Sequence, residues 1–365
     1  MKVTFPHLGN TCFAAKAVFD GLGVDYIIPP LSNREALEIG SFYSPEEMCL
    51  PFKIMIGNYI QSIKQGADTI LIVGSCGPCR FGEYCELQMN LLKKLGYNLN
   101  FIVLDYPKDI GLKELMRRLL SIGSVSKKSA IEKLKVVHQG LKIINLMDSI
   151  DKKVKLLSGY EIKKGQCKNI LEDCKLKAFK TTSPEEMIFT IKKHMEQLSK
   201  VTISKNKKPL KIAIIGEIYT IIEPFSNLFI EEKLMNYGVS TARYLSPSWW
   251  IKDMVLSPLK LNSLSLRRNS KKYLPYYIGG HARECIGEAV LADKSGFDGA
   301  IQIFPMGCMP EIVSKSILPT ISKDRNFPIL TLIVDEMTGE AGYITRIEAF
   351  LDLLERRKKN VLYGS

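Results

Sequence analysis

The stretch from 68 to 85 constrains the fold more than any other part of this sequence. A run of β-forming residues at 69–73 stops at Gly74, and cysteines follow at positions 76, 79 and 85. The run is short, apolar and rich in Ile and Val, which indicates a strand buried on both faces of a parallel sheet. Such sheets bind ligands in the loops that leave the carboxyl ends of their strands. We therefore predict that Cys76 and Cys79 hold a metal, and that this metal is iron.

The residues around this strand alternate between strand and helix patterns. Strands are expected at 2–7, 25–28, 69–73 and 100–105, and helices at about 13–21, 44–63 and 86–95. The helix at 44 is expected because Ser44 is a good N-cap, Pro45 suits the first turn, and two acidic residues follow. This alternation predicts an α/β domain of the doubly wound (Rossmann-like or flavodoxin-like) kind with a parallel sheet.

The second half of the chain repeats this plan. Residues 211–239 again read as strand, loop, helix and Gly-Val, and Asp298 precedes a strand at 299–305 as Asp68 precedes the strand at 69–73. Cys76 follows Asp68 by eight positions and Cys308 follows Asp298 by ten, and the next strands end at Asp105 and Asp335. We therefore predict two related α/β domains, at 1–110 and 206–365. Between them, at 111–205, we expect a Lys-rich helical segment with helices at about 111–121, 126–149 and 185–199.

Charge is concentrated in one part of the chain. The net charge is +13 over 365 residues, and residues 151–210 alone carry 15 Lys against 7 acidic residues. This segment has no Arg and few aromatic residues, which is unsuited to reading bases, so we expect no nucleic-acid partner. Solvated helices explain the lysines, and a docking surface for an acidic protein or a phosphate-bearing cofactor is the alternative. No apolar run reaches the ~18 residues of a membrane span, and there is no signal-peptide pattern, so we expect a cytoplasmic protein without a membrane partner.

Nine cysteines, an odd number in a chain without an export signal, argue against a disulfide framework and for thiols or metal. If the carboxyl edges of the two sheets face one another, Cys308 can converge with Cys76 and Cys79. The other candidate ligands are Cys12, Cys49 and Cys85. Thiolates without clustered histidines or carboxylates suit an iron–sulfur cluster or zinc. A redox-active dithiol at Cys76 and Cys79 is a further alternative.

The remaining cysteines have simpler explanations. Cys167 and Cys174 are spaced to share a helix face, and Cys285 is expected to pack in a helix. Three residues next to the predicted carboxyl edges are candidate catalytic groups. They are His7, after the first strand, and Glu217 and Tyr219, after the first strand of the second domain.

Several motifs together resemble a known family. They are PHLGN (6–10), CLPFK (49–53), GN (57–58), CGPCRFG (76–82), GCMPE (307–311), DEMTGEAG (335–342) and TRIEAF (345–350). This set is similar to the proteins related to 2-hydroxyacyl-CoA dehydratases and their activases, including relatives of the double-cubane cluster proteins. The resemblance covers nearly the whole chain outside 110–205.

The resemblance implies two α/β domains around an oxygen-sensitive iron–sulfur cluster in the cleft between them. Cys49, Cys76, Cys79 and Cys308 match the ligand motifs of the family, and Gly77, Pro78 and Gly307 lie in the same motifs. Four thiolates suit one [4Fe-4S] cluster, whereas six, with Cys12 and Cys85, suit an [8Fe-9S] double cubane. An ATP-hydrolysing iron–sulfur activase would deliver low-potential electrons, and a homodimer is expected by analogy.

Three functions follow from these expectations. The favoured one is an oxidoreductase that depends on the activase and reduces a small molecule at the cluster. The second is a subunit of a 2-hydroxyacyl-CoA dehydratase, which removes water by radical chemistry. The third is a metal-binding scaffold without enzymatic activity.

Overall fold

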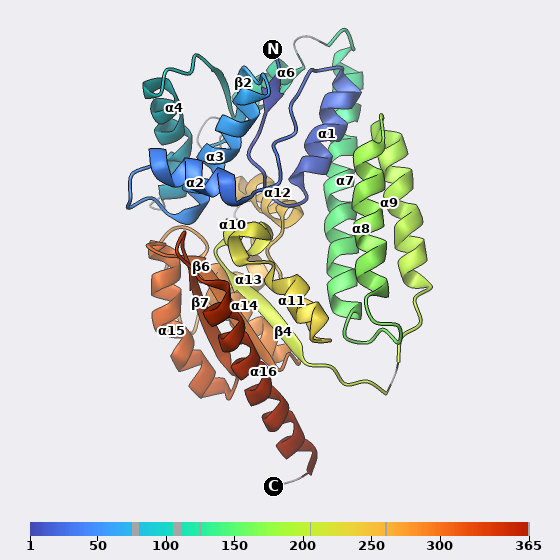
Figure 1. Cartoon of the computed structure of the whole chain (residues 1–365), viewed down its shortest axis with the longest axis vertical. Coiled ribbons are helices and arrows are strands. Elements are labelled where there is room, and N and C mark those ends of the chain that lie inside the picture. The colour runs from blue at the N-terminus through green and yellow to red at the C-terminus, as the bar shows by residue number, and fades with distance from the viewer. Residues whose placement is uncertain (75–79, 105–110, 124–125, 205, 260, 364–365) are drawn as a thin grey trace. The chain divides into compact units, whose positions relative to one another are not determined.

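Figure 1 shows the computed structural model of the chain, which describes residues 1–74, 80–104, 111–123, 126–204, 206–259 and 261–363. Its contacts divide the chain into two compact units. The first unit comprises Met1–Ile150, Glu172–Glu196 and Ser246–Asn262, and the second comprises Asp151–Leu171, Gln197–Leu245 and Ser263–Ser365. These units differ from the three consecutive segments expected from the sequence, because the helices between 111 and 205 are divided between them. Each unit is an α/β structure with its own parallel sheet.

The sheet of the first unit has the order β1-β2-β3, with β1 (Val3–Thr4), β2 (Thr69–Val73) and β3 (Asn100–Leu104) all parallel. The strand expected at 69–73 is confirmed. The strand expected at 2–7 is shorter, and the one expected at 25–28 is reduced to a single parallel bridge between Val3 and Tyr26. Pro29 and Pro30 follow this bridge, and because proline lacks an N–H it does not extend a ladder.

The helices of the first unit include α1 (Thr11–Leu22), α2 (Arg34–Tyr43), α3 (Leu50–Lys64), α4 (Tyr84–Lys94) and α6 (Leu112–Ile122), with the 3-10 turn η1 (Arg80–Glu83) before α4. The helix start predicted at Ser44 is wrong. Ser44 is the extended C-cap of α2, and α3 begins only after Cys49, with Pro51 in its first turn. Pro45 disfavours helical geometry at Ser44, so the second proline, Pro51, marks the true start.

α2 and α3 cross at two glycines. A Cβ atom at Gly57 would lie 1.8 Å from the carbonyl oxygen of Ala36, and one at Gly40 would lie 1.7 Å from that of Lys53. The two backbones are therefore in direct contact, which only glycine permits. This contact explains why glycine occupies position 57 of the GN motif.

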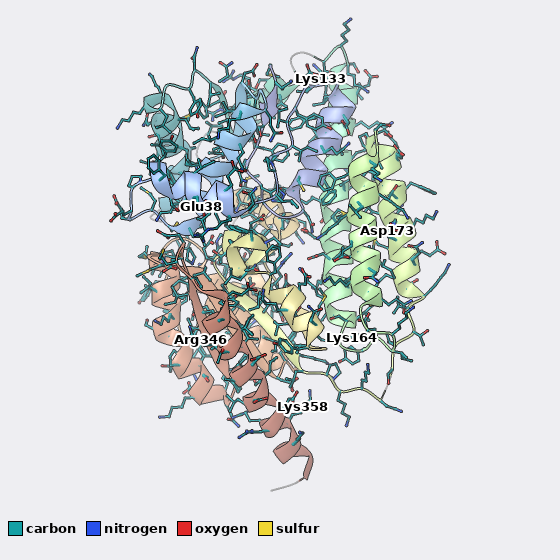
Figure 2. All side chains as sticks on the ribbon, in the orientation of Figure 1. Glu38, Lys133, Lys164, Asp173, Arg346 and Lys358 are labelled. Carbon is teal, nitrogen blue, oxygen red and sulfur yellow. The ribbon has the colours of Figure 1, made fainter. Side chains whose placement is uncertain are left out.

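Three long helices, α7 (Ala130–Leu157), α8 (Gln166–Lys180) and α9 (Pro184–Ser199), lie side by side in Figure 1. In the first unit α9 contacts α8 through His194, whose ring nitrogen lies 3.0 Å from Asp173, and contacts α7 through a hydrogen bond from Gln139 to Glu185 at 2.6 Å. Phe179 of α8 packs on Phe13 of α1 at 4.3 Å between centroids. Most lysines of 151–210 are exposed, as solvated helices predict. Figure 2 labels two charged residues of this region, Lys164 before α8 and Asp173 on α8.

The first unit also contains α12 (Pro247–Leu256) and the turn η3 (Ser257–Leu259). Asp148 of α7 holds α12 in place, because one carboxylate oxygen accepts a hydrogen bond from Ser248 N at 2.8 Å and the other accepts one from Asn10 at 2.9 Å. This buried carboxylate thus joins the start of α1 to the start of α12.

The sheet of the second unit has the order β5-β4-β6-β7 and is also parallel. Its strands are β4 (Lys211–Gly216), β5 (Ser240–Ala242), β6 (Gly299–Pro305) and β7 (Ile329–Val334). The helices and turns around it are α10 (Ile218–Ile222), η2 (Phe225–Asn227), α11 (Ile230–Asn236), α13 (Leu264–Ser270), α14 (Ala282–Lys294), α15 (Met309–Arg325) and α16 (Glu340–Tyr363). The strand predicted at 299–305 is confirmed.

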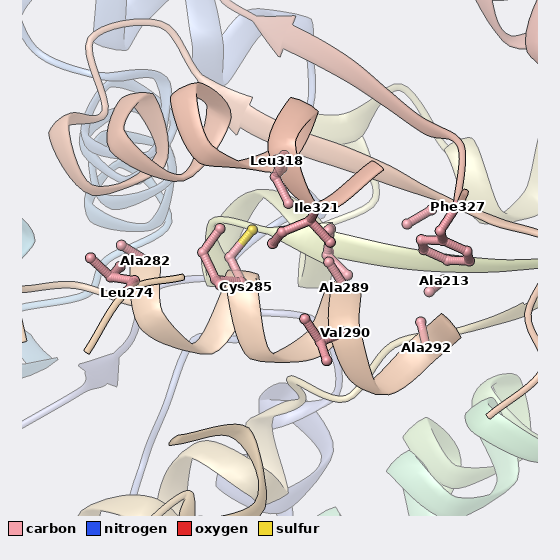
Figure 3. Close-up of a cluster of buried hydrophobic side chains, with 13 residues drawn as sticks. Ala213, Leu274, Ala282, Cys285, Ala289, Val290, Ala292, Leu318, Ile321 and Phe327 are labelled. Atoms are coloured by element: carbon pink, nitrogen blue, oxygen red, sulfur yellow. The ribbon is translucent and has the colours of Figure 1, made fainter. Parts of the chain in front are cut away.

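The core of the second unit lies between the sheet and helices α14 and α15. Figure 3 shows side chains of α14, including Cys285, Ala289 and Val290, packed with Leu318 and Ile321 of α15. Cys285 is fully buried in this apolar cluster, as expected for a packed cysteine. Cys167 and Cys174 are likewise buried, on one face of α8.

Within the second unit, a buried group of four charges joins the end of α7 to α11 and to the residue after β5. The amine of Lys155 donates to Asp151 at 2.6 Å and to Glu231 of α11 at 2.5 Å. Arg243, just after β5, donates to the same two carboxylates. Two cations and two anions therefore compensate one another away from water, and removal of one partner is far more costly than the net value of the pair.

Among the described residues, none of the helices has both the length and the apolar character that a membrane span requires.

Candidate metal centre

Topology brings two of the predicted ligands, Cys49 and Cys85, toward the carboxyl edge of the first unit's sheet. Strands β1 and β2 are parallel, so the connection between them must return from the carboxyl edge to the amino edge, and α3 is its last helix. The start of α3, with Cys49 as its N-cap, therefore lies toward the carboxyl edge. Cys85 is in the first turn of α4, which follows β2.

Cys49 and Cys85 both lie beside Tyr84. The Cys49 thiol is in hydrogen-bond contact with the Tyr84 hydroxyl, and Cys85 is the next residue along α4. Tyr84 is almost fully buried, and its ring packs edge-to-face on Phe52 of α3 at 5.0 Å between centroids. The N-terminal partial charge of α3 favours a thiolate at Cys49, and the Tyr84 hydroxyl is placed to donate to that thiolate. The structure thus places two of the predicted ligands around one buried tyrosine.

Cys12 is buried in the first turn of α1, and its thiol donates to the carbonyl of Gly9 at 3.2 Å. Within the described ranges, no three or more His, Cys, Asp or Glu side chains are grouped so that they could hold a metal ion. Cys12, Cys49 and Cys85 therefore do not form a ready three-ligand set. Cys76 and Cys79, with Gly77 and Pro78 between them, lie outside the described residues, and their roles stay predictions.

Two further side chains near Cys85 were not predicted from the sequence. Tyr59 of α3 and Gln88 of α4 are both fully buried, and within the described part of the chain neither the Tyr59 hydroxyl nor the two amide atoms of Gln88 have a hydrogen-bond partner. Burial, followed by the negative charge of nearby Cys85, raises the pKa of Tyr59 above its ordinary value, so this hydroxyl keeps its proton. The sequence signal for Gln88 is its spacing: Tyr84, Cys85, Gln88 and Leu92 form the buried face of α4.

In the second unit, Cys308 is the N-cap of α15 and is buried. Gly307 before it has a φ of 78°, a left-handed geometry that glycine adopts without strain. The backbone N–H of Ile312 donates to the Cys308 carbonyl at 2.9 Å, which closes the first turn of the helix. The GCMPE motif is thus a strand-to-helix turn at the carboxyl edge of β6.

The three candidate catalytic residues are either buried or held by hydrogen bonds. His7 is buried in the loop after β1. Glu217 is the N-cap of α10, and its carboxylate accepts hydrogen bonds from the N–H groups of Tyr219 and Thr220 and from the Thr220 hydroxyl. Tyr219 is fully buried. The cap accounts for Glu217 structurally, and the catalytic roles of these three residues stay predictions.

A buried acidic group near Cys308 was also missed. Gln302 of β6 donates to the Glu311 carboxylate at 2.9 Å, and Glu284 and Glu288 of α14 are buried in the same unit. Burial raises the pKa of Glu311 to about 7 and the pKa of Glu288 well above its ordinary range. A signal was available for Glu311, which follows Cys308 by three positions, as Cys79 follows Cys76.

No protein-family model matches this sequence, and no curated protein matches it either. The resemblance to the dehydratase-related proteins therefore remains a prediction.

Proposed function

We propose that this chain binds an iron–sulfur cluster and uses it to pass low-potential electrons, supplied by an ATP-hydrolysing activase, to a small molecule. The observation that carries the proposal is the contact of Cys49 with Tyr84, the residue before Cys85, beside buried polar groups that have no hydrogen-bond partner among the described residues. Cys49 is half-buried and Cys85 is buried, and two soft sulfur donors on adjoining helices suit iron–sulfur ligation.

The proposal includes a duplicated architecture of two related, doubly wound α/β domains. Supporting it, both sheets are parallel, and β1-β2-β3 corresponds in order to β4-β6-β7. The bridge at Tyr26 lies beside β1 as β5 lies beside β4. At the start of each sheet, an aspartate accepts a backbone hydrogen bond: Asp68 from Lys2 N at 2.7 Å, and Asp298 from Lys211 N at 2.8 Å.

The donor set fits an iron–sulfur cluster. Cys49 and Cys85 are described thiols at helix starts, where N–H groups and helix charge favour thiolates. The sequence adds Cys76, Cys79, Cys308 and Cys12. When bound, the cluster would take up one electron at a time from the activase and release it to the substrate, whose identity stays open.

Residues of this chain would position the Cys49 thiol and exclude water from its surroundings. Phe52 and Tyr84 are almost fully buried, and their rings make an edge-to-face contact beside Cys49. The Tyr84 hydroxyl orients the Cys49 sulfur. A largely buried edge of this kind would limit the access of oxygen and water to a cluster held there.

The test is anaerobic purification, with iron and sulfide quantified per chain and the electron paramagnetic resonance spectrum recorded after reduction by titanium(III) citrate. About four irons would support one [4Fe-4S] cluster, and about eight would support the double cubane. Cys49→Ser is expected to lose most of the iron, and Cys85→Ser to lose it only if about eight are present. Cys174→Ser, a buried cysteine on α8 of the same unit, is the control and should keep all of it.

Electron delivery is measured separately, by following the same spectrum after addition of ATP and an activase of the 2-hydroxyacyl-CoA dehydratase systems, with ATP omitted as the control. A chain that contains zinc and no iron would contradict the proposal and favour a metal-binding scaffold.

A further inference from the structure

Two buried polar side chains of the first unit have no hydrogen-bond partner among the residues that the structure describes. They are Gln88 and Tyr59, both 0% exposed, and the atoms without a partner are Gln88 Nε2, Gln88 Oε1 and Tyr59 Oη. A buried polar group without a partner carries its full desolvation cost, and more than 90% of such groups in proteins are satisfied. Such groups in native proteins therefore call for a specific explanation.

The orientation of α4 indicates where the missing partner would lie. Side chains of an α-helix lean toward its N-terminus, so the Gln88 amide extends over the turn that carries Tyr84 and Cys85. Tyr59 lies on the neighbouring helix α3, whose Phe52 packs on Tyr84 of α4. Both unpartnered groups therefore lie on the pair of helices that carries Cys49 and Cys85.

We infer that the Gln88 amide and the Tyr59 hydroxyl donate hydrogen bonds to sulfur atoms of the iron–sulfur cluster and so make it easier to reduce. The inference rests on the proposed function. Reduction adds negative charge to the cluster, and an N–H or O–H donor directed at its sulfur stabilises the reduced form more than the oxidised form. Gln88 and Tyr59 are thus positioning residues that set the reduction potential.

The inference makes two predictions of opposite sign for Gln88→Met, which keeps the length of the side chain and removes its polar atoms. In the cluster-loaded protein, the midpoint potential measured by an electron paramagnetic resonance redox titration should become more negative, with an unchanged iron content. In the iron-free protein, the midpoint of urea unfolding should rise, because an unpartnered amide has been replaced by an apolar group. Tyr59→Phe should shift both quantities in the same directions.

Gln61→Met is the matched control. Gln61 is a buried glutamine of α3 in the same unit, but its amide nitrogen donates to Glu35 at 2.9 Å and to Asn33 at 3.2 Å. These bonds hold the Gln61 amide at the start of α2. This variant should lower the urea midpoint of the iron-free protein and leave the reduction potential unchanged.

The outcomes separate the inference from the proposed function. If the wild type binds iron and Gln88→Met leaves the midpoint potential unchanged, the inference is overturned and the proposed function stands. A lower urea midpoint for iron-free Gln88→Met would also overturn it, because Gln88 would then have a structural partner such as a buried water. If the wild type binds no iron, the proposed function fails and the inference fails with it.

Discussion

The two units share a framework but differ in what they place at the carboxyl edges of their sheets. Asp68 and Asp298 anchor the first strands, and Gly57 and Gly287 permit backbone contact between paired helices. A Cβ at Gly57 would meet Ala36 O at 1.8 Å, and one at Gly287 would meet Leu266 O at 2.3 Å. These three pairs of positions, 36 and 266, 57 and 287, and 68 and 298, are each separated by 230 residues.

The chemistry at the edges is different. The first unit places the buried Cys85 and the half-buried Cys49 with the buried, neutral side chains of Tyr59 and Gln88. The second unit buries one thiol at this edge, Cys308, and three carboxyl groups behind it, Glu284, Glu288 and Glu311. The shared positions make backbone contacts, which fix the fold, whereas the side chains at the edges make few such contacts. Substitutions at the edges can therefore change the chemistry without changing the framework.

The largest expected effect tests the framework at its helix crossings. Gly57→Ala and Gly287→Ala each place a methyl group against a backbone carbonyl that cannot move away as a side chain does. We expect each to lower the free energy of unfolding by about 3 kcal/mol or more, the upper range for overpacking, with Gly57 the more severe because its contact is shorter. Urea unfolding monitored by circular dichroism measures this change.

Gly342→Ala is the control for the helix crossings. Gly342 lies in α16 with no atom within 4 Å of the added Cβ, so alanine should stabilise the helix by up to about 1 kcal/mol. If Gly287→Ala behaved like Gly342→Ala while Gly57→Ala was destabilising, the two crossings would not be equivalent.

The second prediction tests the buried carboxyl group of Glu311, at the edge of the sheet in the second unit. The Glu311 carboxyl is buried, and its pKa is raised from 4.5 to about 7. Between these values the unfolded chain releases the proton while the folded chain keeps it, so the free energy of unfolding falls as the pH rises. The loss attributable to Glu311 is about 3 kcal/mol over this interval, at about 1.4 kcal/mol per unit. Glu311→Gln should remove this part of the slope, leave the part that Glu288 contributes, and match the wild type below a pH of about 4.5.

Urea unfolding at a series of pH values from 4 to 8 measures the slope. Glu355→Gln, on an exposed position of α16, removes a carboxyl group from the same unit and should keep the wild-type slope. A Glu311→Gln protein with the wild-type slope would show that the Glu311 carboxyl ionises freely in the folded state, and the contrast between the edges would then be wrong.

Much of the framework was predictable because it depends on local patterns. The strands at 69–73 and 299–305 are apolar runs, the second of them buried along its whole length, and the aspartate before each run was visible as a repeat. The existence of α2 was not predicted, and the start of α3 was misplaced at Ser44. Two prolines, Pro45 and Pro51, gave competing start signals, and only the packing of α2 on α3 decides between them.

The chemistry of the edges was only partly predictable. The cysteines could be recognised by residue type, and six of them were expected to be ligands. Gln88, Tyr59 and Glu288 are ordinary polar residues in helices, and their importance comes from complete burial, which tertiary packing produces. Sequence patterns identify which face of a helix is buried, but not whether a polar group on that face finds a partner.

The smallest expected effect concerns Asp68 and Asp298, whose carboxylates each accept a backbone hydrogen bond at the start of a sheet. It tests whether the two carboxylates are equivalent. Asp68→Ala removes the bond to Lys2 N and Asp298→Ala the one to Lys211 N, and each should lower the free energy of unfolding by about 1 kcal/mol at neutral pH. Asp298 should have the larger effect, because it also pairs with Lys358 at 2.8 Å and is less exposed than Asp68, which water screens.

The hydrogen bond from Lys2 N lowers the pKa of Asp68, so the contribution of Asp68 to stability is present above its ordinary pKa and is lost as the pH falls. Urea unfolding at pH 7 and pH 3 should therefore show a difference between wild type and Asp68→Ala that shrinks at the lower pH, and a difference that is independent of pH would mean that the charge of Asp68 plays no part in anchoring the strand.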